Sequence, residues 1–443
     1  MKLWQKNYQV DQEIERFTVG QDRELDLALA PYDIQGSLAH IKMLCKVGLL
    51  EEDELTQLVK GLQDLYQAVE EGQFTIDEGI EDVHSQVEHL LIKNVGEIGK
   101  KIHSGRSRND QVLVDLKLYL RAEVRQIIQD VERLFQTLLE LSEKHKYQQL
   151  PGYTHLQVAM VSSFGLWFGA YAESLVDDLQ QWLSTFKILN QNPLGSAAGY
   201  GSSFPLDRKM TTELLGFDDL NYNVVHAQMG RGKSELFMAF SLAATGHTLG
   251  KLAMDVCLFI NQNFGFIAFP DELTTGSSIM PHKKNPDVFE IIRGRCNQLI
   301  SLPAQVSLLT TNLPSGYHRE FQLLKEVLFP AIEQVKDCLQ MATFALQHIQ
   351  IKENILEDEK YLYLYSVEEV NRLVLEGTPF RDAYKIVGQQ IANGSFAPER
   401  EVAHTHAGSL GNLCNDAIEG KWQRVIQEFN FSTIDERMQQ LLG

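Results

Sequence analysis

One uninterrupted stretch of helix-forming sequence constrains the fold of this chain more than any other feature. Between Gln111 and Tyr147 there is no glycine and no proline, the residues that most often end helices. Apolar residues recur at intervals of three and four, which is typical of one face of a helix: Leu116, Leu120, Val124, Ile127, Val131, Leu134, Leu138 and Leu141. Such a helix would be roughly 55 Å long, so the fold around it must be elongated.

Four further helical segments of comparable length follow along the chain. They lie at about 156–189, 231–263, 285–311 and 321–349, and an uncharged Gly/Ser-rich loop, 192–205, separates the first two. Five long helices predict an all-α fold built on an elongated bundle. We expect three domains: an N-terminal helical domain at 1–105, the central bundle at 106–350 and a small C-terminal helical domain at 351–443.

Some of these helices are apolar around most of their circumference. The segment 236–260 is the clearest example, with apolar residues on every side. A helix of this kind is normally buried all round. A single five-helix bundle cannot bury every helix in this way, but several bundles packed together can. The sequence therefore predicts an obligate oligomer.

Charge and cysteine content exclude several classes of protein. The 40 basic and 59 acidic residues give a net charge of −19, which disfavours binding to nucleic acid or to an anionic membrane surface. The five cysteines are far apart and include no CxxC pair, which disfavours a disulfide framework or a cysteine-rich zinc site. The first residues are polar and do not resemble a signal peptide. These features predict a cytoplasmic protein.

The stretch from Leu150 to Ala172 carries no formal charge and is long enough to span a bilayer. It also contains Pro151, Gly152 and His155, which are poorly suited to a membrane span. We interpret it as a turn followed by a buried helix, so no membrane association is expected.

Three segments contain side chains suited to chemistry. The first, residues 99–111, combines Arg106, Arg108 and Asn109 with two serines and two glycines. Arginines with neutral donors suit the recognition of a carboxylate, and this basic segment is unusual in so acidic a chain. The alternative is a solvated basic loop in which Asp110 caps the following helix.

The second segment, residues 151–157, contains His155 between Thr154 and Gln157. A histidine at this place is suited to act as a general acid or base. The alternative is a structural hydrogen bond at the start of the predicted helix.

The third segment, residues 274–287, contains adjacent hydroxyl groups, two lysines and Asn285 around a glycine. Backbone N–H groups, cations and an amide in one loop are suited to stabilise an oxyanion. The alternative is a surface loop after which Asp287 begins a helix.

Together the three segments are suited to a β-elimination. A hydrogen on the carbon beside a carboxylate is very weakly acidic, so its removal needs a base and strong stabilisation of the dianion that forms. The third segment offers both, and His155 could protonate the leaving group. This chemistry requires no cofactor and no metal.

The same segments resemble those of the fumarase/aspartase superfamily and, within it, of the argininosuccinate lyase family. The superfamily signature GSSxMPxKxNP occurs at 276–286. The segments HSGRSRNDQ at 103–111, PGYTHLQ at 151–157 and KKNPD at 283–287 are similar to those of argininosuccinate lyases. The resemblance implies the cleavage of argininosuccinate to arginine and fumarate, the last step of arginine biosynthesis. It also implies a helical homotetramer whose sites each contain loops from three subunits.

The resemblance further implies roles for individual residues. Ser277 would remove the proton from the succinyl carbon, and Lys283 would hold the adjacent carboxylate. His155 would protonate the departing nitrogen, with Glu290 orienting and charging it. Substrate binding would fall to Arg108, Asn109, Thr154, Asn285, Tyr317, Gln322 and Lys325, of which Tyr317, Gln322 and Lys325 would contact the arginine part.

Several positions depart from the family pattern, and two alternatives follow from them. The departures include His282, the pair Leu323-Leu324, and Gly230 and Gly232, where acidic residues are usual. His282 is more familiar in adenylosuccinate lyases, which makes another fumarate-releasing lyase the first alternative. The two glycines favour the second, a non-catalytic scaffold like the related lens crystallins.

Overall fold

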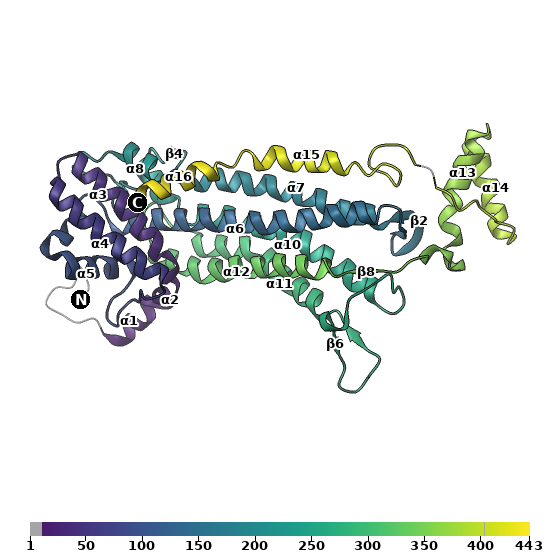
Figure 1. The fold of residues 1–443 in the computed structure, drawn as a ribbon, viewed down its shortest axis with the longest axis horizontal. Helices are drawn as coiled ribbons and strands as arrows, with labels where there is room; N and C mark the ends of the chain where they lie inside the picture. The colour runs from purple at the N-terminus through teal and green to yellow at the C-terminus, as the bar shows by residue number, and fades with distance from the viewer. Residues whose placement is uncertain (1–10, 403) are drawn as a thin grey trace.

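The computed structural model, described for residues 11–402 and 404–443, is an elongated bundle of helices (Figure 1). Five long helices form its centre: α6 (Arg108–Lys144), α7 (Phe164–Leu189), α10 (Lys233–Ile260), α11 (Asp287–Thr310) and α12 (Leu323–Leu346). The predicted all-α fold and five-helix bundle are confirmed. Residues 1–10, on which the prediction about a signal peptide rests, lie outside the described part of the chain.

Smaller helices occupy both ends of the bundle. At the N-terminal end lie α1 (Gln12–Val19), α2 (Asp22–Asp26), α3 (Ala30–Lys46), α4 (Glu52–Glu70) and α5 (Val83–Val95) (Figure 1). The other helices are α8 (Arg208–Leu214), α9 (Val224–Met229), α13 (Ser366–Leu375), α14 (Phe380–Ala392), α15 (Asn415–Ile426) and α16 (Phe431–Leu442). Six 3₁₀ helices complete them: η1 (Leu27–Leu29), η2 (Gly96–His103), η3 (Asp271–Leu273), η4 (Arg319–Gln322), η5 (Ile355–Glu357) and η6 (Glu359–Tyr365).

The strands are short and form four separate pairs. Antiparallel pairs join β1 (Gln149–Thr154) to β2 (Gln157–Ser163), β5 (Ile267–Ala268) to β8 (Gln350–Ile351), and β6 (Thr275–Gly276) to β7 (Lys284–Asn285). One parallel pair joins β3 (Gln191–Asn192) to β4 (Asp219–Leu220). None of these pairs contributes a layer to the core, which lies between the helices.

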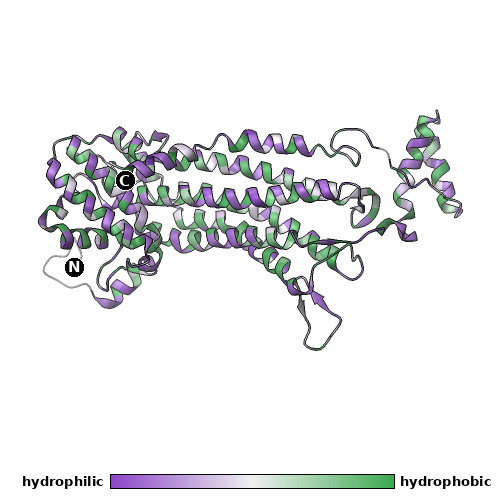
Figure 2. Cartoon of the chain, in the orientation of Figure 1, coloured by the Kyte–Doolittle hydropathy of each residue, from purple (hydrophilic) through white to green (hydrophobic). Residues whose placement is uncertain are grey.

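The helix pattern of the sequence accounts for the bundle. All eight apolar residues that mark one face of α6 in the sequence are buried. Where α10 crosses α11, Gly246 and Gly250 leave room for the neighbouring helix, because a Cβ at either position would lie 3.2 to 3.4 Å from atoms of α11. Apolar and polar residues both occur along each of the long helices (Figure 2).

The C-terminal segment does not stay together in space. Helices α13 and α14 lie at the end of the bundle opposite the N-terminal helices and share a small core of Val370, Ala383, Val387 and Phe396 (Figure 1). Helix α15 returns along α7, and α16 reaches α3. The domain boundaries at 105 and 350 remain predictions, and only α13 and α14 form a separate cluster beyond the second of them.

The predicted helix at 156–189 begins later than expected. Residues 149–163 form the β1–β2 hairpin instead, with His155 and Leu156 at its tip in left-handed conformations (φ 53° and 58°). The sequence after the tip contains β-branched Val158 and Val161 and no charge, which favours a strand, and the Ser163 side chain caps α7 by accepting a hydrogen bond from the Leu166 N–H. His155 therefore lies on a hairpin and not at a helix start.

None of the described helices is both long and apolar enough to cross a bilayer.

Asp110 joins the start of α6 to the Gly/Ser-rich loop 192–205. The N-cap of α6 is Ser107 and not Asp110, which sits one turn later and accepts a hydrogen bond from the Ser107 N–H at 2.8 Å. Its other oxygen accepts bonds from the N–H groups of Gly195 and Ala197, each at 2.9 Å, and the side chain is fully buried.

Replacement of Asp110 by Asn should therefore destabilise the protein by about 2 kcal/mol or more, because an amide group would turn a donor toward N–H donors in a buried place. Urea unfolding followed by circular dichroism measures the loss. The matched control is Asp435→Asn, which breaks an exposed ion pair with Arg125 and should cost less than about 1 kcal/mol. Equal stability of the two variants would contradict the anchoring role of Asp110.

Candidate active site

Five of the predicted binding residues line one cavity of about 160 Å³ at the N-terminal end of the bundle. Arg108 and Asn109 come from the first turn of α6, whereas Tyr317 and Gln322 precede α12 and Lys325 lies in its first turn. These two segments are about 200 residues apart in the sequence. The fold thus brings these five residues together, and their roles in substrate binding remain predictions.

Lys325 is held inside the chain by two carboxylates of α2. Its ammonium lies 2.9 Å from Asp22 Oδ1 and also pairs with Asp26. Burial opposes the charge of Lys325, but Asp26 and Asp22 outweigh it and raise the pKa of the lysine. The N-terminal segment is therefore part of the wall of the cavity, which the sequence did not indicate.

Arg108 is fixed in a similar way. It donates a hydrogen bond to Ser85 Oγ at 2.6 Å and pairs with Asp82 and, at 3.5 Å, with Glu81. Glu81 also accepts a hydrogen bond from Arg319 at 2.8 Å. Burial disfavours the charged form of Arg108, yet Asp82 and Glu81 raise its pKa. Cations and carboxylates are thus paired around the cavity. Asp82 and Glu81 hold the guanidinium groups of Arg108 and Arg319 in place.

Arg231 and Arg319 are cavity residues that the sequence reasoning missed. Arg231 lies between Gly230 and Gly232, and Arg319 lies two residues after Tyr317, so both are next to positions that the family resemblance identifies. Arg231 is buried and donates hydrogen bonds to Glu235 at 2.9 Å and to the Phe321 carbonyl at 2.6 Å. It therefore joins the start of α10 to the segment that carries Tyr317 and Gln322.

A buried acidic cluster adjoins this cavity, because its His84 is one of the lining residues. His84 Nδ1 is 2.8 Å from Asp33 Oδ1 and 3.3 Å from Asp115 Oδ2. Among the residues that the structure describes, this is the group whose ligand atoms are close enough to hold a metal ion. Burial, followed by the neighbouring Asp33, raises the pKa of Asp115 well above its usual range. The imidazole of His84 and a proton retained on Asp115 thus already offset the negative charge of these carboxylates. This favours an internal hydrogen-bonded cluster over a metal site.

The predicted catalytic residues lie elsewhere in the chain. Thr154 and His155 are exposed at the tip of the β1–β2 hairpin. This hairpin follows the far end of α6, whereas Arg108 begins the helix, so the length of α6, roughly 55 Å, separates them (Figure 1). Within one chain His155 cannot reach the cavity.

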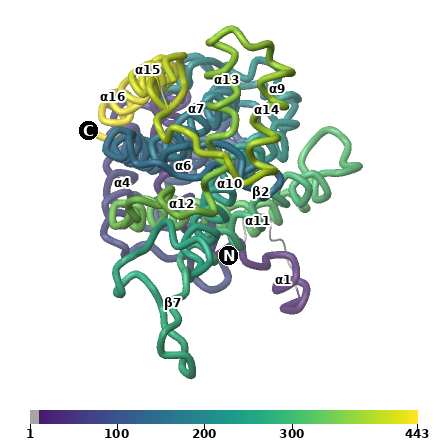
Figure 3. The backbone as a smooth tube through the Cα atoms, turned by 90° about the vertical axis from the view of Figure 1, so that its right-hand side faces the viewer, coloured from purple at the N-terminus to yellow at the C-terminus, as the bar shows by residue number. Residues whose placement is uncertain are grey.

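The third segment forms a loop that projects from the bundle between β6 and β7 (Figures 1 and 3). Ser277 is partly exposed, and its Oγ accepts hydrogen bonds from the N–H groups of Ile279 (3.3 Å) and Met280 (3.1 Å). Lys283 and Glu290 are exposed to solvent and Asn285 is partly buried. The predicted residues therefore fall into three separate places in one chain.

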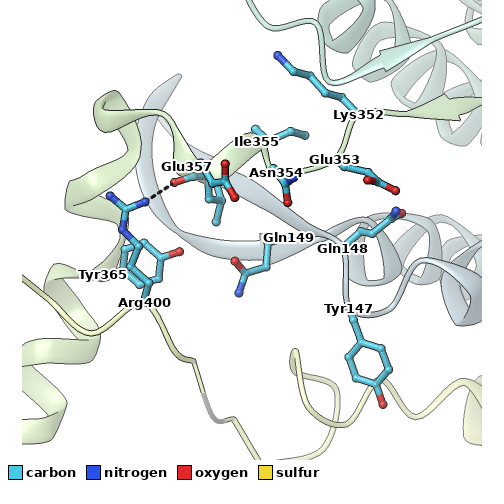
Figure 4. A pocket seen from close by; sticks show the side chains of 11 residues that line it. Tyr147, Gln148, Gln149, Lys352, Glu353, Asn354, Ile355, Glu357, Tyr365 and Arg400 are labelled. Atoms are coloured by element: carbon cyan, nitrogen blue, oxygen red, sulfur yellow. Dashed lines mark hydrogen bonds between the residues drawn. The ribbon is translucent and has the colours of Figure 1, made fainter.

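A second cavity, of about 410 Å³, lies near the C-terminal end of α6 (Figure 4). It is lined by residues 147–149 and 352–357 together with Tyr365 and Arg400, which donates a hydrogen bond to the Leu356 carbonyl at 3.2 Å. None of the predicted site residues lines it, so it is not the candidate active site.

The sequence is similar to those of known lyases. A family model described as lyase matches residues 6–301. The argininosuccinate lyase of Bacteroides fragilis is 60% identical over 442 residues, which cover 100% of this chain and 99% of the relative. That of Thermotoga neapolitana is 39% identical over 389 residues, covering 88% and 98%.

Two solved structures share the fold. The structure of EDDS lyase in complex with formate aligns with a TM-score of 0.77 at 20% identity, covering 98% of this chain and 95% of the other. The class II fumarase of Schistosoma mansoni aligns with a TM-score of 0.71 at 16% identity, covering 96% and 94%. Fold and sequence together define a carbon–nitrogen lyase of the fumarase/aspartase superfamily. Within that superfamily, the chain belongs to the argininosuccinate lyase family.

One departure from the family pattern has a structural reason. Gly232 has a left-handed conformation (φ 78°), and a Cβ at this position would lie 2.5 Å from Thr310 Cγ2. Its N–H donates a hydrogen bond to Glu235 at the start of α10. A glycine here therefore fits the backbone and does not indicate a lost function.

Introduction of the acidic residue that is usual in the family, Gly232→Asp, should lower the free energy of unfolding by about 2 kcal/mol or more. The cause is backbone strain together with the contact to Thr310. Chemical denaturation measures it, with Lys233→Asp at the next, exposed position as control. A Gly232→Asp protein as stable as this control would show that the loop relaxes freely.

Proposed function

We propose that this chain catalyses the reversible β-elimination of argininosuccinate to arginine and fumarate. The observation that carries the proposal is the cavity in which Arg108, Asn109, Tyr317, Gln322 and Lys325 meet. These are five of the seven residues that the family resemblance assigns to substrate binding, and the chain is 60% identical to an argininosuccinate lyase over its full length. The proposed reaction would contribute to arginine biosynthesis in the cytoplasm.

In the proposed mechanism, each of the three groups of residues has a separate role. The cavity would hold the arginine part and a carboxylate of the substrate. Ser277 would remove the proton from the succinyl carbon, and Lys283 and Asn285 would stabilise the dianion. His155 would then protonate the departing guanidine nitrogen, with Glu290 beside it. A serine is a weak base, so its alkoxide must be favoured by the nearby cations and by exclusion of water.

The mechanism requires other copies of the chain, because one chain keeps the three groups apart. We propose a homotetramer whose sites combine loops of different subunits. Exposed apolar side chains on α10 and α11 support this assembly: Phe240, Met254, Ile300 and Leu308, which are 37 to 75% exposed in the single chain. Burial of these side chains against other copies would stabilise the assembly through the hydrophobic effect.

The two alternatives receive less support. His282, which favours adenylosuccinate as the substrate, is a single position on the β6–β7 loop, whereas the chain is 60% identical to an argininosuccinate lyase over its full length. The scaffold hypothesis rested on the two glycines, and the backbone explains Gly232 without loss of function.

The test is fumarate release, followed by ultraviolet absorbance, from argininosuccinate and adenylosuccinate in parallel. We expect release from argininosuccinate alone. Release from adenylosuccinate would contradict the proposed substrate, and release from neither, despite binding of arginine and fumarate, would favour the scaffold.

A further inference from the structure

Another cavity, of about 230 Å³, lies between α3, α6 and the C-terminal helix α16. It shares no lining residue with the cavity around Arg108, although α6 contributes to both. Its central residue, Arg121, lies about 20 Å further along α6 than Arg108. The cavity around Arg121 is therefore a separate place, which the proposed mechanism does not use.

Arg121 is a buried cation whose hydrogen-bond partners are all neutral. Its side chain is 4% exposed and donates to Asn190 Oδ1 (2.9 Å), the Gly216 carbonyl (3.1 Å) and the Leu215 carbonyl (2.9 Å). Burial lowers the pKa of Arg121 to about 10, so the guanidinium is still charged at neutral pH. A buried charge is costly unless an opposite charge compensates it.

The hydrogen bonds of Arg121 leave part of its guanidinium available to a ligand. They start from Nη1 and Nη2, and no described residue accepts one from Nε. Nε is not among the fully enclosed polar atoms that lack a partner, so its N–H is open to the cavity that Arg121 lines. Lys117, one turn earlier, differs because three oxygens accept hydrogen bonds from its three N–H groups.

A second guanidinium, that of Arg125, lines the same cavity one turn later on α6. It pairs with Asp435 of α16, with 2.7 Å between Arg125 Nη2 and Asp435 Oδ2. Both side chains of this pair are partly exposed, so solvent weakens their attraction. The lining of the cavity thus contains two guanidinium groups and one carboxylate, which leaves one positive charge without a partner.

The remaining walls are largely apolar. Leu118 and Ile434 are buried side chains of α6 and α16 that line the cavity. Phe431, also in the lining, lies against the guanidinium of Arg125, whose Cζ is 5.5 Å from the ring centre. Guanidinium groups bind carboxylates through paired hydrogen bonds, and apolar walls accommodate a hydrocarbon body. The lining therefore suits a small organic acid.

We propose that the cavity around Arg121 is a second ligand site, which binds a small organic acid with one carboxylate on an apolar body. The carboxylate accepts hydrogen bonds from Arg121 Nε and from Arg125, and it compensates the buried charge. The apolar body contacts Leu118, Ile434 and Phe431. All lining residues belong to one chain, so this site needs neither lyase activity nor assembly with other copies.

Isothermal titration calorimetry of the full-length protein with sodium benzoate tests the proposal. We expect saturable binding that is at least about tenfold tighter than that of benzamide, which has a similar shape but no charge. Saturating arginine and fumarate, which belong to the proposed active site, should leave benzoate binding unchanged. Absence of benzoate binding, equal affinity for benzamide, or displacement by arginine and fumarate would overturn the proposal.

Two variants at the partly exposed ion pair should change the affinity in opposite directions. Arg125→Gln removes a donor to the carboxylate and should weaken benzoate binding about tenfold. Asp435→Asn removes the carboxylate that competes for Arg125 and should strengthen binding several-fold. Arg133→Gln, which breaks a pair with Asp130 outside the cavity, is the matched control and should bind as the wild type does. A change in the same direction in Arg125→Gln and Asp435→Asn, or none in either, would contradict the assignment.

Crystals soaked in 4-bromobenzoate locate the ligand through the anomalous scattering of bromine. We expect a bromine peak between α3, α6 and α16 in the wild type, and none there in Arg125→Gln at the same concentration. A peak only in the cavity around Arg108, or no peak in the cavity around Arg121, would refute the site. None of these measurements uses fumarate release, so their failure is distinguishable from failure of the proposed function.

Discussion

Replacement of Ser277 by Ala is expected to lower the rate of fumarate release by about 10³-fold or more, the size of effect that loss of a general base produces. The hydroxyl lies on the projecting β6–β7 loop, where its Oγ accepts hydrogen bonds only from two N–H groups of the same loop. The fold should therefore be preserved, with an unchanged circular dichroism spectrum and melting temperature.

Steady-state kinetics measure this effect, and binding of fumarate and arginine shows whether the site remains assembled. Ser184→Ala is a suitable control, because it removes an exposed hydroxyl from α7, far from the loop in sequence. The decisive observation is exchange of the succinyl proton with deuterium from the solvent. If Ser277→Ala exchanged this proton at the wild-type rate, Ser277 would not be the base.

The long helices could be predicted because their apolar periodicity is a local property of the sequence. The segment 149–163 could not, because its short uncharged sequence fits a buried helix as well as a hairpin. The separation of α13 and α14 from α15 and α16 could not be predicted either. Whether α15 packs on α7 or on α14 depends on contacts between distant segments, which no local pattern encodes.

In the site, too, some residues could be identified from local sequence motifs, whereas others depend on contacts between distant segments. Family motifs identified Arg108 and Lys325, and the structure brings both to one cavity. Their partners could not be recognised, because Asp22 and Asp26 lie about 300 residues from Lys325 in the sequence. The sequence alone does not identify the N-cap of α6, because Ser107 and Asp110 are both good capping residues. The backbone conformation makes Ser107 the N-cap.

Two inactive variants should restore activity when they assemble together. If His155 and Ser277 of one site come from different subunits, mixed oligomers of His155→Asn and Ser277→Ala chains contain some sites with both residues intact. If the two variants are present in equal amounts and assemble at random, His155 and Ser277 are each intact at a given site with a probability of about one half. About a quarter of the sites should therefore be active. The structure motivates this expectation, because the hairpin that carries His155 and the loop that carries Ser277 lie apart in both views of the chain (Figures 1 and 3).

The measurement is fumarate release by co-expressed chains that carry different affinity tags and are purified through both. A matched control pairs Ser277→Ala with Lys283→Met, two changes in the same loop of one chain. Because one subunit supplies the whole loop to a site, no mixed oligomer can contain a loop with both residues intact, and activity should stay at the level of the single variants. Recovery in this control, or none with the His155→Asn pair, would contradict a site in which His155 and Ser277 come from different subunits.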